Sequence, residues 1–418
     1  MESVPIQYLI NSDECELLNN LLRLDSNTDS KSEIFFKTNI FDKLFTQIDP
    51  LNSNSFFLQN KYLYYLSSGA LAYLEAMDTM RVLGDKSEEY EINAVTKVIK
   101  DKISNYTNYD FVSLGCGNGH KDFSIVNNLE NYKPMYIPID VSPHFLQLSI
   151  KHFISNSLRS NKAAYDYKKI RPINCDFFNF SETLVIGEDK PKIYTCLGNT
   201  IGNYQENGLL KNFHKIMKKN DFLIVSFDLY QSENEFEKHI NRYLNHSCMD
   251  FLINPLKLIP KYKGLLNKTK YFNIYSEKDK HQKKISNIDG GLSVVPTFYI
   301  PYNDQSVFVC WSTKYLMDKV GIFFKNHDLF EFVHGREEGE DKYVVLLKIK
   351  EDNIKKKKAI KILNELLKEE PDESNNIELI TEYIKSDKAS AEDIDIIIEK
   401  SSYSIIRPNF KKKSIGIR

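Results

Sequence analysis

Residues 111–121 read FVSLGCGNGHK, a short apolar run that leads into three glycines at alternate positions. A second apolar run, MYIPI at 135–139, ends in Asp140. Glycines let the backbone turn tightly and approach a ligand without a Cβ clash. An acid after the second strand of an open α/β sheet can accept hydrogen bonds from a ribose diol. The loop and the acid together predict a nucleoside-binding edge of such a sheet.

The spacing of the glycines narrows the choice of ligand. The pattern is G-x-G-x-G rather than G-x-G-x-x-G, and nothing in the chain resembles the G-x-x-x-x-G-K-[ST] phosphate loop. A dinucleotide or a triphosphate is therefore less favoured than a small nucleoside cofactor without phosphates, and S-adenosylmethionine fits that description. From the loop alone, an unliganded strand–loop–helix is the alternative.

Length and composition bound the class of protein. The chain has 418 residues, enough for one large domain with additions or for two domains. Its 56 basic and 57 acidic residues nearly balance, which argues against nucleic acid or a membrane as partner. The six cysteines are scattered without a C-x-x-C pair, which favours a reducing compartment over a zinc or disulfide framework. Neither a secretory signal nor a membrane-spanning apolar run is evident, so we expect a cytoplasmic protein.

Strands and helices alternate through the middle of the chain. The expected strands are residues 111–114, 135–139, 171–175, 192–197 and 222–227, and the expected helices between them are 120–128, 144–158 and 206–218. This alternation predicts an α/β fold with a Rossmann-like sheet of parallel strands, right-handed crossovers and ligands at the carboxyl ends of the strands.

Four regions follow from the pattern along the chain. We expect a helical N-terminal region over 1–95, a Rossmann-like cofactor domain over 96–230 and 305–350, an inserted substrate-binding segment over 231–304, and a charged helical tail over 351–418. Later elements are expected as strands at 292–300, 307–311 and 343–349 and a helix at 314–326. Within the insertion, residues 231–290 have no clear pattern. The tail fits solvated helices better than a docking or nucleic-acid arm.

A metal site is not expected. His239 and His246 lie near Asp250, but a spacing of seven without a clear third ligand indicates chance.

Three more segments place small and polar residues at the ends of expected strands. NCDFF at 174–178 ends the third strand, where an acid followed by an aromatic ring can bond and pack on adenine. CLGNTIGNY at 196–204 ends the fourth strand, and CWSTKY at 310–315 ends a late one. Amide and hydroxyl groups at this edge lie where two substrates of a transferase would meet.

Together these segments resemble the ergothioneine-pathway histidine Nα-methyltransferase family, which depends on S-adenosylmethionine. Its G-S-T-I-G-N-F motif is similar to GNTIGNY at 198–204, and its V-P-I-D-I-S strand to IPIDVS at 137–142. Its late E-x-S-x-K-[YF] motif matches CWSTKY at 310–315 except at the first position, and its Tyr-Tyr-x-Thr-Arg segment looks like YYLSS at 64–68. The resemblance covers roughly residues 60–350 and implies a class I methyltransferase sheet with an inserted acceptor-binding domain.

The resemblance also implies site residues. The cofactor would be S-adenosyl-L-methionine, and the residues that would bind it are Gly115, Gly117, Lys121, Asp140, Asp176, Phe177 and Gly198. Lys121 would pair with the methionine carboxylate. The candidate catalytic residues, which would orient the acceptor amine, are Asn203 and Tyr64, and the acceptor would contact Tyr65, Asn203, Cys310 and Ser312.

One departure from the family bears on the acceptor. Cys310 stands where the family has a glutamate that helps bind the imidazole of histidine. A neutral thiol cannot supply that charge-assisted hydrogen bond, worth about 1.5–3 kcal/mol. We therefore predict an N-methyltransferase acting on the α-amino group of an amino acid or a related small amine, with free histidine disfavoured.

Other functions remain open. The alternatives are a peptide or protein N-methyltransferase, and a non-catalytic scaffold of the same fold that acts through its tail. A nucleic-acid methyltransferase is disfavoured, because GNTIGN at 198–203 stands where an N-P-P-[YF] motif would be expected.

Overall fold

The structure is a computed structural model, and it describes residues 7–8, 45–49, 52–58, 63–64, 67–83, 85–159, 167–177, 180, 186, 190–257, 272–276, 286–300, 305–339, 341–350, 359–360, 362–363, 374–385 and 394. The chain divides into two compact units, Met1–His327 with Phe332–Leu347 and Asp328–Glu331 with Lys348–Arg418. The predicted site residues that the structure describes all lie in the first unit.

An eight-stranded sheet organises the first unit, in the order β1-β6-β5-β4-β7-β8-β14-β13. Its strands are β1 (Gln7–Tyr8), β4 (Asp110–Leu114), β5 (Tyr136–Asp140), β6 (Ile173–Asn174), β7 (Lys192–Cys196), β8 (Phe222–Asp228), β13 (Phe330–Glu338) and β14 (Lys342–Ile349). Neighbours from β1 to β8 pair in parallel. The predicted α/β fold with a Rossmann-like sheet is confirmed, and each of its five central strands lies where the sequence pattern put it to within two residues at either end.

The order of the strands reverses between β4 and β7. The chain adds β5 and β6 on one side of β4, and β7 and β8 on the other. In open α/β sheets, ligands bind at the carboxyl ends of the strands beside such a reversal. The glycine loop follows β4 and the GNTIGNY segment follows β7, so both lie at this position.

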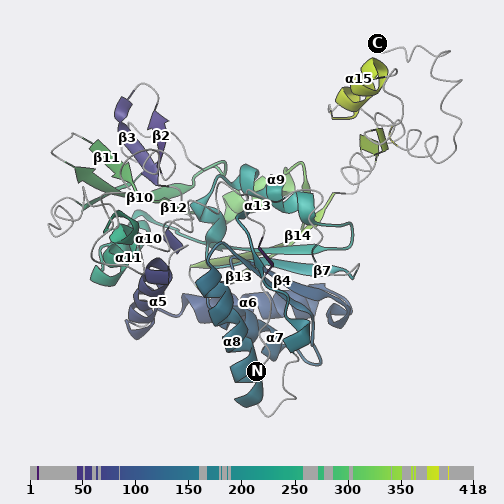
Figure 1. Ribbon diagram of the computed structural model, residues 1–418, viewed down its shortest axis with the longest axis horizontal. Coiled ribbons are helices and arrows are strands. Elements are labelled where there is room, and N and C mark those ends of the chain that lie inside the picture. Colours follow the sequence, from purple (N-terminus) through teal and green to yellow (C-terminus); the bar gives the residue numbers. More distant parts are fainter. Residues whose placement is uncertain are drawn as a thin grey trace, which may run out of the picture. The chain divides into compact units, whose positions relative to one another are not determined.

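Helices cover both faces of this sheet (Figure 1). One face carries α6 (Ser87–Lys102), α7 (His120–Asn128) and α8 (Pro143–Arg159), and the other carries α9 (Glu206–Ile216) and α13 (Met317–Lys325). The helices expected at 120–128, 144–158 and 206–218 are therefore present. The helix expected at 314–326 begins later, because residues 312–314 form a strand.

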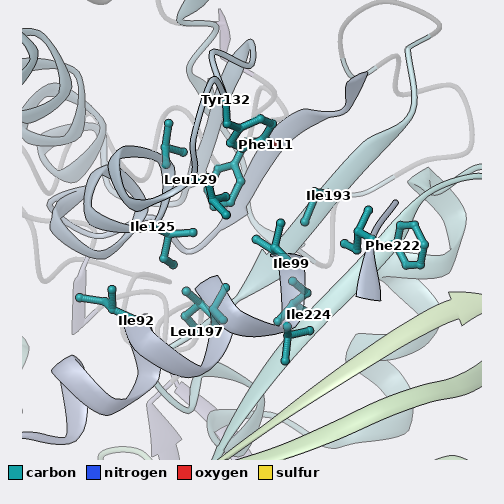
Figure 2. Close-up of a cluster of buried hydrophobic side chains, with 14 of the residues drawn as sticks. Ile92, Ile99, Phe111, Ile125, Leu129, Tyr132, Ile193, Leu197, Phe222 and Ile224 are labelled. Atoms are coloured by element: carbon teal, nitrogen blue, oxygen red, sulfur yellow. The ribbon is translucent and has the colours of Figure 1, made fainter. Parts of the chain in front are cut away.

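The core under the site is the layer between α6, α7 and the sheet (Figure 2). Ile92 and Ile99 of α6 lie two turns apart on one face of the helix, and they join Phe111 of β4, Ile193 of β7 and Ile224 of β8 in one cluster. A buried side chain of this size contributes about 1.5–3 kcal/mol. This packing holds the strands that carry the two site loops.

A second, six-stranded sheet runs β12-β10-β11-β3-β2, with β9 paired to β10. Its strands are β2 (Phe45–Asp49), β3 (Asn52–Leu58), β9 (Phe272–Ser276), β10 (Leu292–Ile300), β11 (Gln305–Phe308) and β12 (Ser312–Lys314). β2 and β3 pair as an antiparallel hairpin, and β3 lies parallel to β11.

This second sheet corrects two expectations. The N-terminal region is not purely helical, because β2 and β3 of this sheet lie before residue 95. The strand expected at 307–311 is β11, and both β11 and β12 belong to the second sheet rather than to the Rossmann-like one. The physical reason is that β3 is completed by a strand about 250 residues further along the chain, which no local pattern reports.

Three helices contribute residues to the wall of the pocket described below: α5 (Ser67–Val82), α10 (Glu233–Tyr243), which packs on β10, and α11 (His246–Lys257). α5 is tied to α11 by hydrogen bonds from Asn254 to Ser68 at 3.1 Å and from Thr79 to Ser247 at 3.2 Å. Ser232 caps α10 by accepting from the Glu235 amide at 3.3 Å. α10 and α11 fill part of the stretch that showed no clear sequence pattern.

The second unit has a small core of its own. α15 (Ser374–Lys385) contributes Ile377 and Ile384 to a buried cluster with Ala359, Leu363 and Ile394. α15 is therefore a helix within the tail that the sequence analysis expected to be helical.

Candidate functional site

A pocket of about 310 Å³ opens at the carboxyl ends of β4, β5, β6 and β7. That volume is at the lower end of the range for small-molecule sites. Eleven predicted site residues line it: Tyr64, Gly115, Gly117, Lys121, Asp140, Asp176, Phe177, Gly198, Asn203, Cys310 and Ser312. The structure thus brings together residues from parts of the chain that are up to 248 positions apart. The remaining one, Tyr65, lies outside the described residues.

The carboxylate of Asp140 faces the glycine loop. Its Oδ2 accepts from the Gly117 amide at 3.0 Å, and its Oδ1 accepts from the Ser142 amide at 2.8 Å. Burial raises the pKa of Asp140 to about 6, although these two amides work in the opposite direction. Oδ2 also accepts from the Cys116 thiol at 3.9 Å, so Oδ1 is the oxygen that keeps a lone pair for a ligand.

The three glycines of the loop are all left-handed. Gly115, Gly117 and Gly119 have φ of 78°, 52° and 74°, which residues with a Cβ rarely adopt. The loop therefore needs glycine for its backbone course as well as for ligand access. Beyond it, the ring of Phe177 lies 3.4 Å from where a Cβ on Gly115 would be, so this aromatic ring borders the loop.

Phe177 is held by other rings. Its centroid lies 5.7 Å from that of Phe213 and 6.1 Å from that of Tyr204, both in edge-on contact. Asp176 precedes it and lines the same pocket, half-buried. An acid beside a fixed aromatic ring is the arrangement that the sequence predicted for an adenine site.

Glu91 of α6 is a site residue that the sequence analysis missed. Its side chain is only 1% exposed, and it accepts from Lys121 at 2.8 Å, from the Gly198 amide at 2.6 Å and from Ser226. Burial would raise the pKa of Glu91, but the charges of Lys121 and Lys342 outweigh it and lower the pKa. The available signal was a charged residue on the apolar face of an amphipathic helix.

Gly198 makes room for the head of Lys121. A Cβ on Gly198 would lie 2.7 Å from Lys121 Nζ, and its φ is 69°. The ammonium donates one hydrogen bond to Glu91, and an ammonium has three donors. Because Gly198 has no side chain, the Lys121 ammonium can lie at the wall of the pocket.

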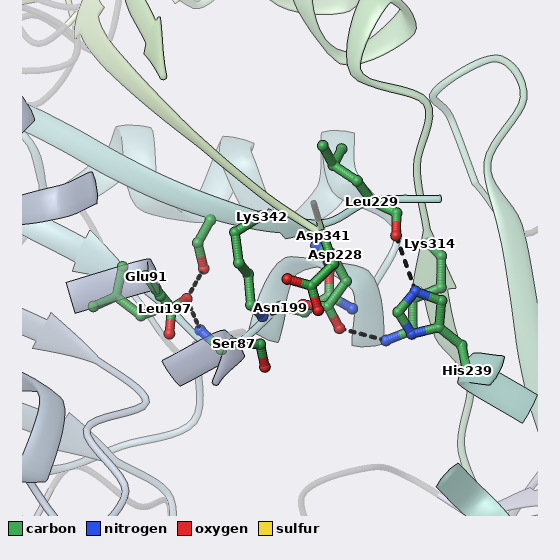
Figure 3. A network of polar contacts seen from close by, with 12 residues as sticks. Ser87, Glu91, Leu197, Asn199, Asp228, Leu229, His239, Lys314, Asp341 and Lys342 are labelled. Carbon is green, nitrogen blue, oxygen red and sulfur yellow. Dashed lines mark hydrogen bonds and ion pairs between the residues drawn. The ribbon is translucent and has the colours of Figure 1, made fainter. Parts of the chain in front are cut away.

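A second buried ionic group surrounds Asp228 at the end of β8 (Figure 3). Its carboxylate accepts from Lys314 at 2.6 Å and from Lys342. Burial would raise the pKa of Asp228, but the two ammonium groups hold it well below its usual range. Asn199 joins the group by accepting from the Asp228 amide at 3.1 Å.

The three residues weighed as a metal site do not come together. His239 donates from Nε2 to the Leu229 carbonyl at 2.9 Å, and burial together with the charge of Lys314 lowers its pKa to about 4. His246 pairs instead with Asp250 at 3.6 Å on the exposed face of α11. Within the described ranges, no group of three His, Cys, Asp or Glu side chains is placed to hold a metal ion.

The far end of the pocket carries aromatic rings and an uncharged thiol. The ring of Tyr64 lies 5.3 Å from Phe251 and 5.4 Å from Tyr73. Cys310 is 7% exposed, and burial raises the pKa of its thiol to about 12, so the thiol is uncharged at neutral pH.

Ser312 joins this end of the pocket to its surroundings. Its hydroxyl accepts from Lys314 at 3.1 Å and from Asn199 at 3.4 Å, and it hydrogen-bonds to Tyr243 of α10. Tyr243 is a second lining residue that the sequence analysis did not identify. Asn203 ends the 3₁₀ turn Thr200–Asn203 and lines the pocket between the two ends of the site.

The residues present fit S-adenosylmethionine. The glycine loop offers close backbone approach, Asp140 offers acceptors for a ribose, Phe177 offers a ring face, and Lys121 offers a cation for a carboxylate. These features lie in one continuous pocket rather than in separate places.

Comparisons with known proteins agree with this geometry. The sequence model of a family described as histidine-specific, S-adenosylmethionine-dependent methyltransferases matches residues 50–286, more than half of the chain. A comparison with curated proteins finds no match.

Solved structures of methyltransferases are also similar to this chain. One is an S-adenosylmethionine-dependent methyltransferase from Clostridium acetobutylicum, 14% identical, with 64% of this chain and 94% of that chain covered and a TM-score of 0.33. Another is the 1,6-didemethyltoxoflavin N1-methyltransferase of Burkholderia thailandensis, 8% identical, with 73% and 95% covered and a TM-score of 0.34. A third is a glycopeptide N-methyltransferase, 9% identical, with 62% and 87% covered and a TM-score of 0.33.

None of the helices in the described part of the chain combines the length and apolar character that a bilayer crossing requires.

Proposed function

We propose that this chain, which belongs to the histidine-specific, S-adenosylmethionine-dependent methyltransferase family, methylates the α-amino group of an amino acid or a related small amine. The observation that supports this most directly is a single pocket in which a nucleoside-type edge meets an end with aromatic rings and an uncharged thiol. Gly117 and Asp140 lie at the nucleoside-type edge. The aromatic end contains Tyr64, Cys310 and Ser312.

The cofactor end would be held by the residues named from the sequence. Asp140 would accept from the ribose, Asp176 and Phe177 would contact the adenine, and Lys121 would pair with the methionine carboxylate. When bound, the cofactor supplies an electrophilic methyl group on a sulfonium. The chain's part is to place the acceptor nitrogen against it and to exclude water.

The acceptor amine must lose a proton before it can attack, and the environment favours that loss. Burial and the like charge of Lys314 beside Ser312 both disfavour an ammonium ion, so the proton is released to solvent before the amine attacks. Tyr64 and Cys310 both stay uncharged at neutral pH, since burial raises the pKa of each. We propose Asn203 and Tyr64 as groups that orient the neutral amine rather than as proton carriers.

Free histidine is disfavoured as the acceptor. Cys310 offers an imidazole no negative charge. Asp228 lines the same pocket, but its carboxylate already accepts from Lys314 and Lys342. A neutral side chain on the acceptor is the better match to this end of the pocket.

Calorimetric titration tests the proposal. The purified chain is titrated with S-adenosylhomocysteine, and the complex is then titrated with histidine and with amino acids that carry neutral side chains. We expect cofactor-product binding, together with tighter binding of a neutral amino acid than of histidine. The absence of any S-adenosylhomocysteine binding would overturn the assignment of the cofactor end.

A pair of variants tests the acceptor end. Cys310→Glu would restore a carboxylate and is expected to raise the affinity for histidine about tenfold or more, the effect of one charge-assisted hydrogen bond. Cys310→Ser is the matched neutral control and is expected to leave histidine binding weak. Tight histidine binding by the unaltered protein would contradict the proposed acceptor, whereas binding of a peptide amine alone would favour the peptide alternative.

A further inference from the structure

Tyr73 lines the pocket, although no motif pointed to it. It lies on α5, and its ring packs edge-on against Tyr64 at 5.4 Å, Phe251 at 5.4 Å and Phe145 at 5.8 Å between centroids. Three ring contacts fix the orientation of the phenol, so its hydroxyl has a defined position.

That hydroxyl has no hydrogen-bond partner anywhere in the described ranges, although the ring is packed on several sides. Other tyrosines in the interior do bond their hydroxyl groups within the protein: Tyr136, Tyr194, Tyr230 and Tyr315. Tyr73 is half-buried, and its hydroxyl remains accessible from the pocket. Because Tyr73 borders the pocket, a ligand in the pocket can supply the missing partner.

The charges around Tyr73 indicate which ligand atoms it faces. Burial raises the pKa of its hydroxyl, the positive charge of Lys121 acts against that rise, and the negative charges of Glu88 and Glu91 add to it. The phenol therefore remains protonated at neutral pH and lies in the field of Lys121. Burial lowers the pKa of Lys121, but the negative charge of Glu91 outweighs it and raises the pKa, so Lys121 stays charged.

Lys121 has donors to spare. Its ammonium bonds to Glu91 at 2.8 Å, and Gly198 leaves the space in which the ammonium lies. Lys121 is also the second residue of α7, so the partial positive charge of a helix N-terminus adds to its own.

A carboxylate is the ligand group that suits this pair. It can accept from a phenol and an ammonium at once, whereas a ligand ammonium would meet the like charge of Lys121. Asp140 occupies the other side of the glycine loop, where the ribose is proposed to bind. The amino-acid end of the cofactor would therefore extend toward Lys121.

We propose that the Tyr73 hydroxyl and the Lys121 ammonium together bind the carboxylate of the cofactor's amino-acid part, which makes Tyr73 a positioning residue for methyl transfer. This inference rests on the proposed function, because it takes the pocket to hold S-adenosylmethionine. It divides the two adjacent tyrosines by role, with Tyr73 serving the cofactor and Tyr64 the acceptor.

Two ligands that differ only in the amino-acid part test the inference by calorimetry, without any turnover. S-adenosylhomocysteine has the carboxylate, and 5′-methylthioadenosine lacks it. We expect Tyr73→Phe, which keeps the packed ring, to weaken S-adenosylhomocysteine binding about 10-fold or more, the effect of a hydrogen bond to a charged group. Binding of 5′-methylthioadenosine should change less than about twofold, since it has no group for the hydroxyl.

Tyr109→Phe is the control, because it also removes only a phenol hydroxyl, from a packed ring that does not line the pocket. It should leave the affinity for both ligands unchanged. Equal weakening of both ligands by Tyr73→Phe would assign Tyr73 to packing alone and overturn the inference. So would an unchanged affinity for S-adenosylhomocysteine. If the unaltered protein binds neither ligand, the proposed function itself fails, which is a different result.

Discussion

Replacing Glu91 with glutamine tests how the site is held together. Glu91 reaches from α6 to three partners on three other segments: Lys121, the Gly198 amide and Ser226. Glutamine keeps one acceptor oxygen and the shape of the side chain, but it removes the charge and turns an amide donor toward a cation. The variant therefore removes the counter-ion of Lys121 and leaves the backbone unchanged.

The loss in the free energy of unfolding caused by Glu91→Gln should lie between the values for a buried and for a surface ion pair. Breaking a fully buried ion pair costs about 3–5 kcal/mol, and a surface pair contributes about 0–1 kcal/mol. The Glu91 side chain is 1% exposed and that of Lys121 is 26% exposed, so water reaches one partner in part. We expect Glu91→Gln to lower the free energy of unfolding by about 2–4 kcal/mol at neutral pH.

Urea denaturation followed by tryptophan fluorescence measures this change. The chain has one tryptophan, Trp311, and it lies in the unit that contains the site. Glu88→Gln is the control on the same helix. Its partner Arg81 is 39% exposed, so we expect a loss of less than about 1 kcal/mol.

The pH dependence gives a second check with a definite sign. The pKa of Glu91 is lowered in the folded protein, so its contribution is fully present above the unfolded pKa, about 4.5, and is lost as the pH falls through the folded value. The stability difference between the unaltered protein and Glu91→Gln should therefore be constant above about pH 5 and shrink below it. If Glu91→Gln costs no more than Glu88→Gln at neutral pH, the reasoning is refuted.

Two more predictions concern single titrating groups. The pKa of Asp140 is about 6, and an ionised carboxylate is the form that accepts from a ribose, so calorimetric affinity for S-adenosylhomocysteine should fall below about pH 6. Asp140→Asn should bind weakly with no such pH dependence, and an unchanged affinity would contradict the ribose assignment. The pKa of His239 is lowered to about 4 in the folded protein, so the unfolded chain binds the extra proton first and stability should fall by about 3 kcal/mol between pH 6.5 and pH 4. His239→Gln should flatten this part of the urea-denaturation profile, and an unaltered slope would show that His239 is not its source.

The sequence carried most of the information about the Rossmann-like sheet. Each central strand is a short buried run with a glycine, an acid or an amide at its end or within the next two residues, and helices of amphipathic pattern separate these runs. Both signals are local, so they can be read without knowledge of the fold. For the same reason, the carboxyl-end residues Asp140 and Gly198 could be assigned to one edge before any coordinates were known.

The second sheet could not be found in that way. β3 pairs with β11, and β2 gains its place only through β3. The partner of such a strand lies far along the chain, and strand propensity depends on the partner more than helix propensity does. β13 was missed for a related reason, since its burial alternates irregularly and it carries several charged residues.

The missed site residues share a physical cause. They lie on helices, whereas the sequence motifs lie at the ends of strands. These residues are Glu91 on α6, Tyr73 on α5 and Tyr243 on α10. Their part in the site depends on which way one face of each helix points, and that direction is set by packing against other segments. A charged or hydroxyl-bearing residue on the apolar face of a helix is the signal that local reading could have used.

The same dependence on packing governs what Cys310 means for the acceptor. Sequence alone says that a thiol replaces a glutamate, and a thiol next to a cation would ionise and supply a negative charge after all. Lys314 is close enough to lower the pKa of Cys310, but burial is the stronger effect and the net shift is upward. Lys314 is itself engaged by Asp228 at 2.6 Å, which limits what it can do for the thiol. The Cys310 thiol thus stays neutral because Lys314 is paired with Asp228. For that reason the acceptor's side chain should be neutral.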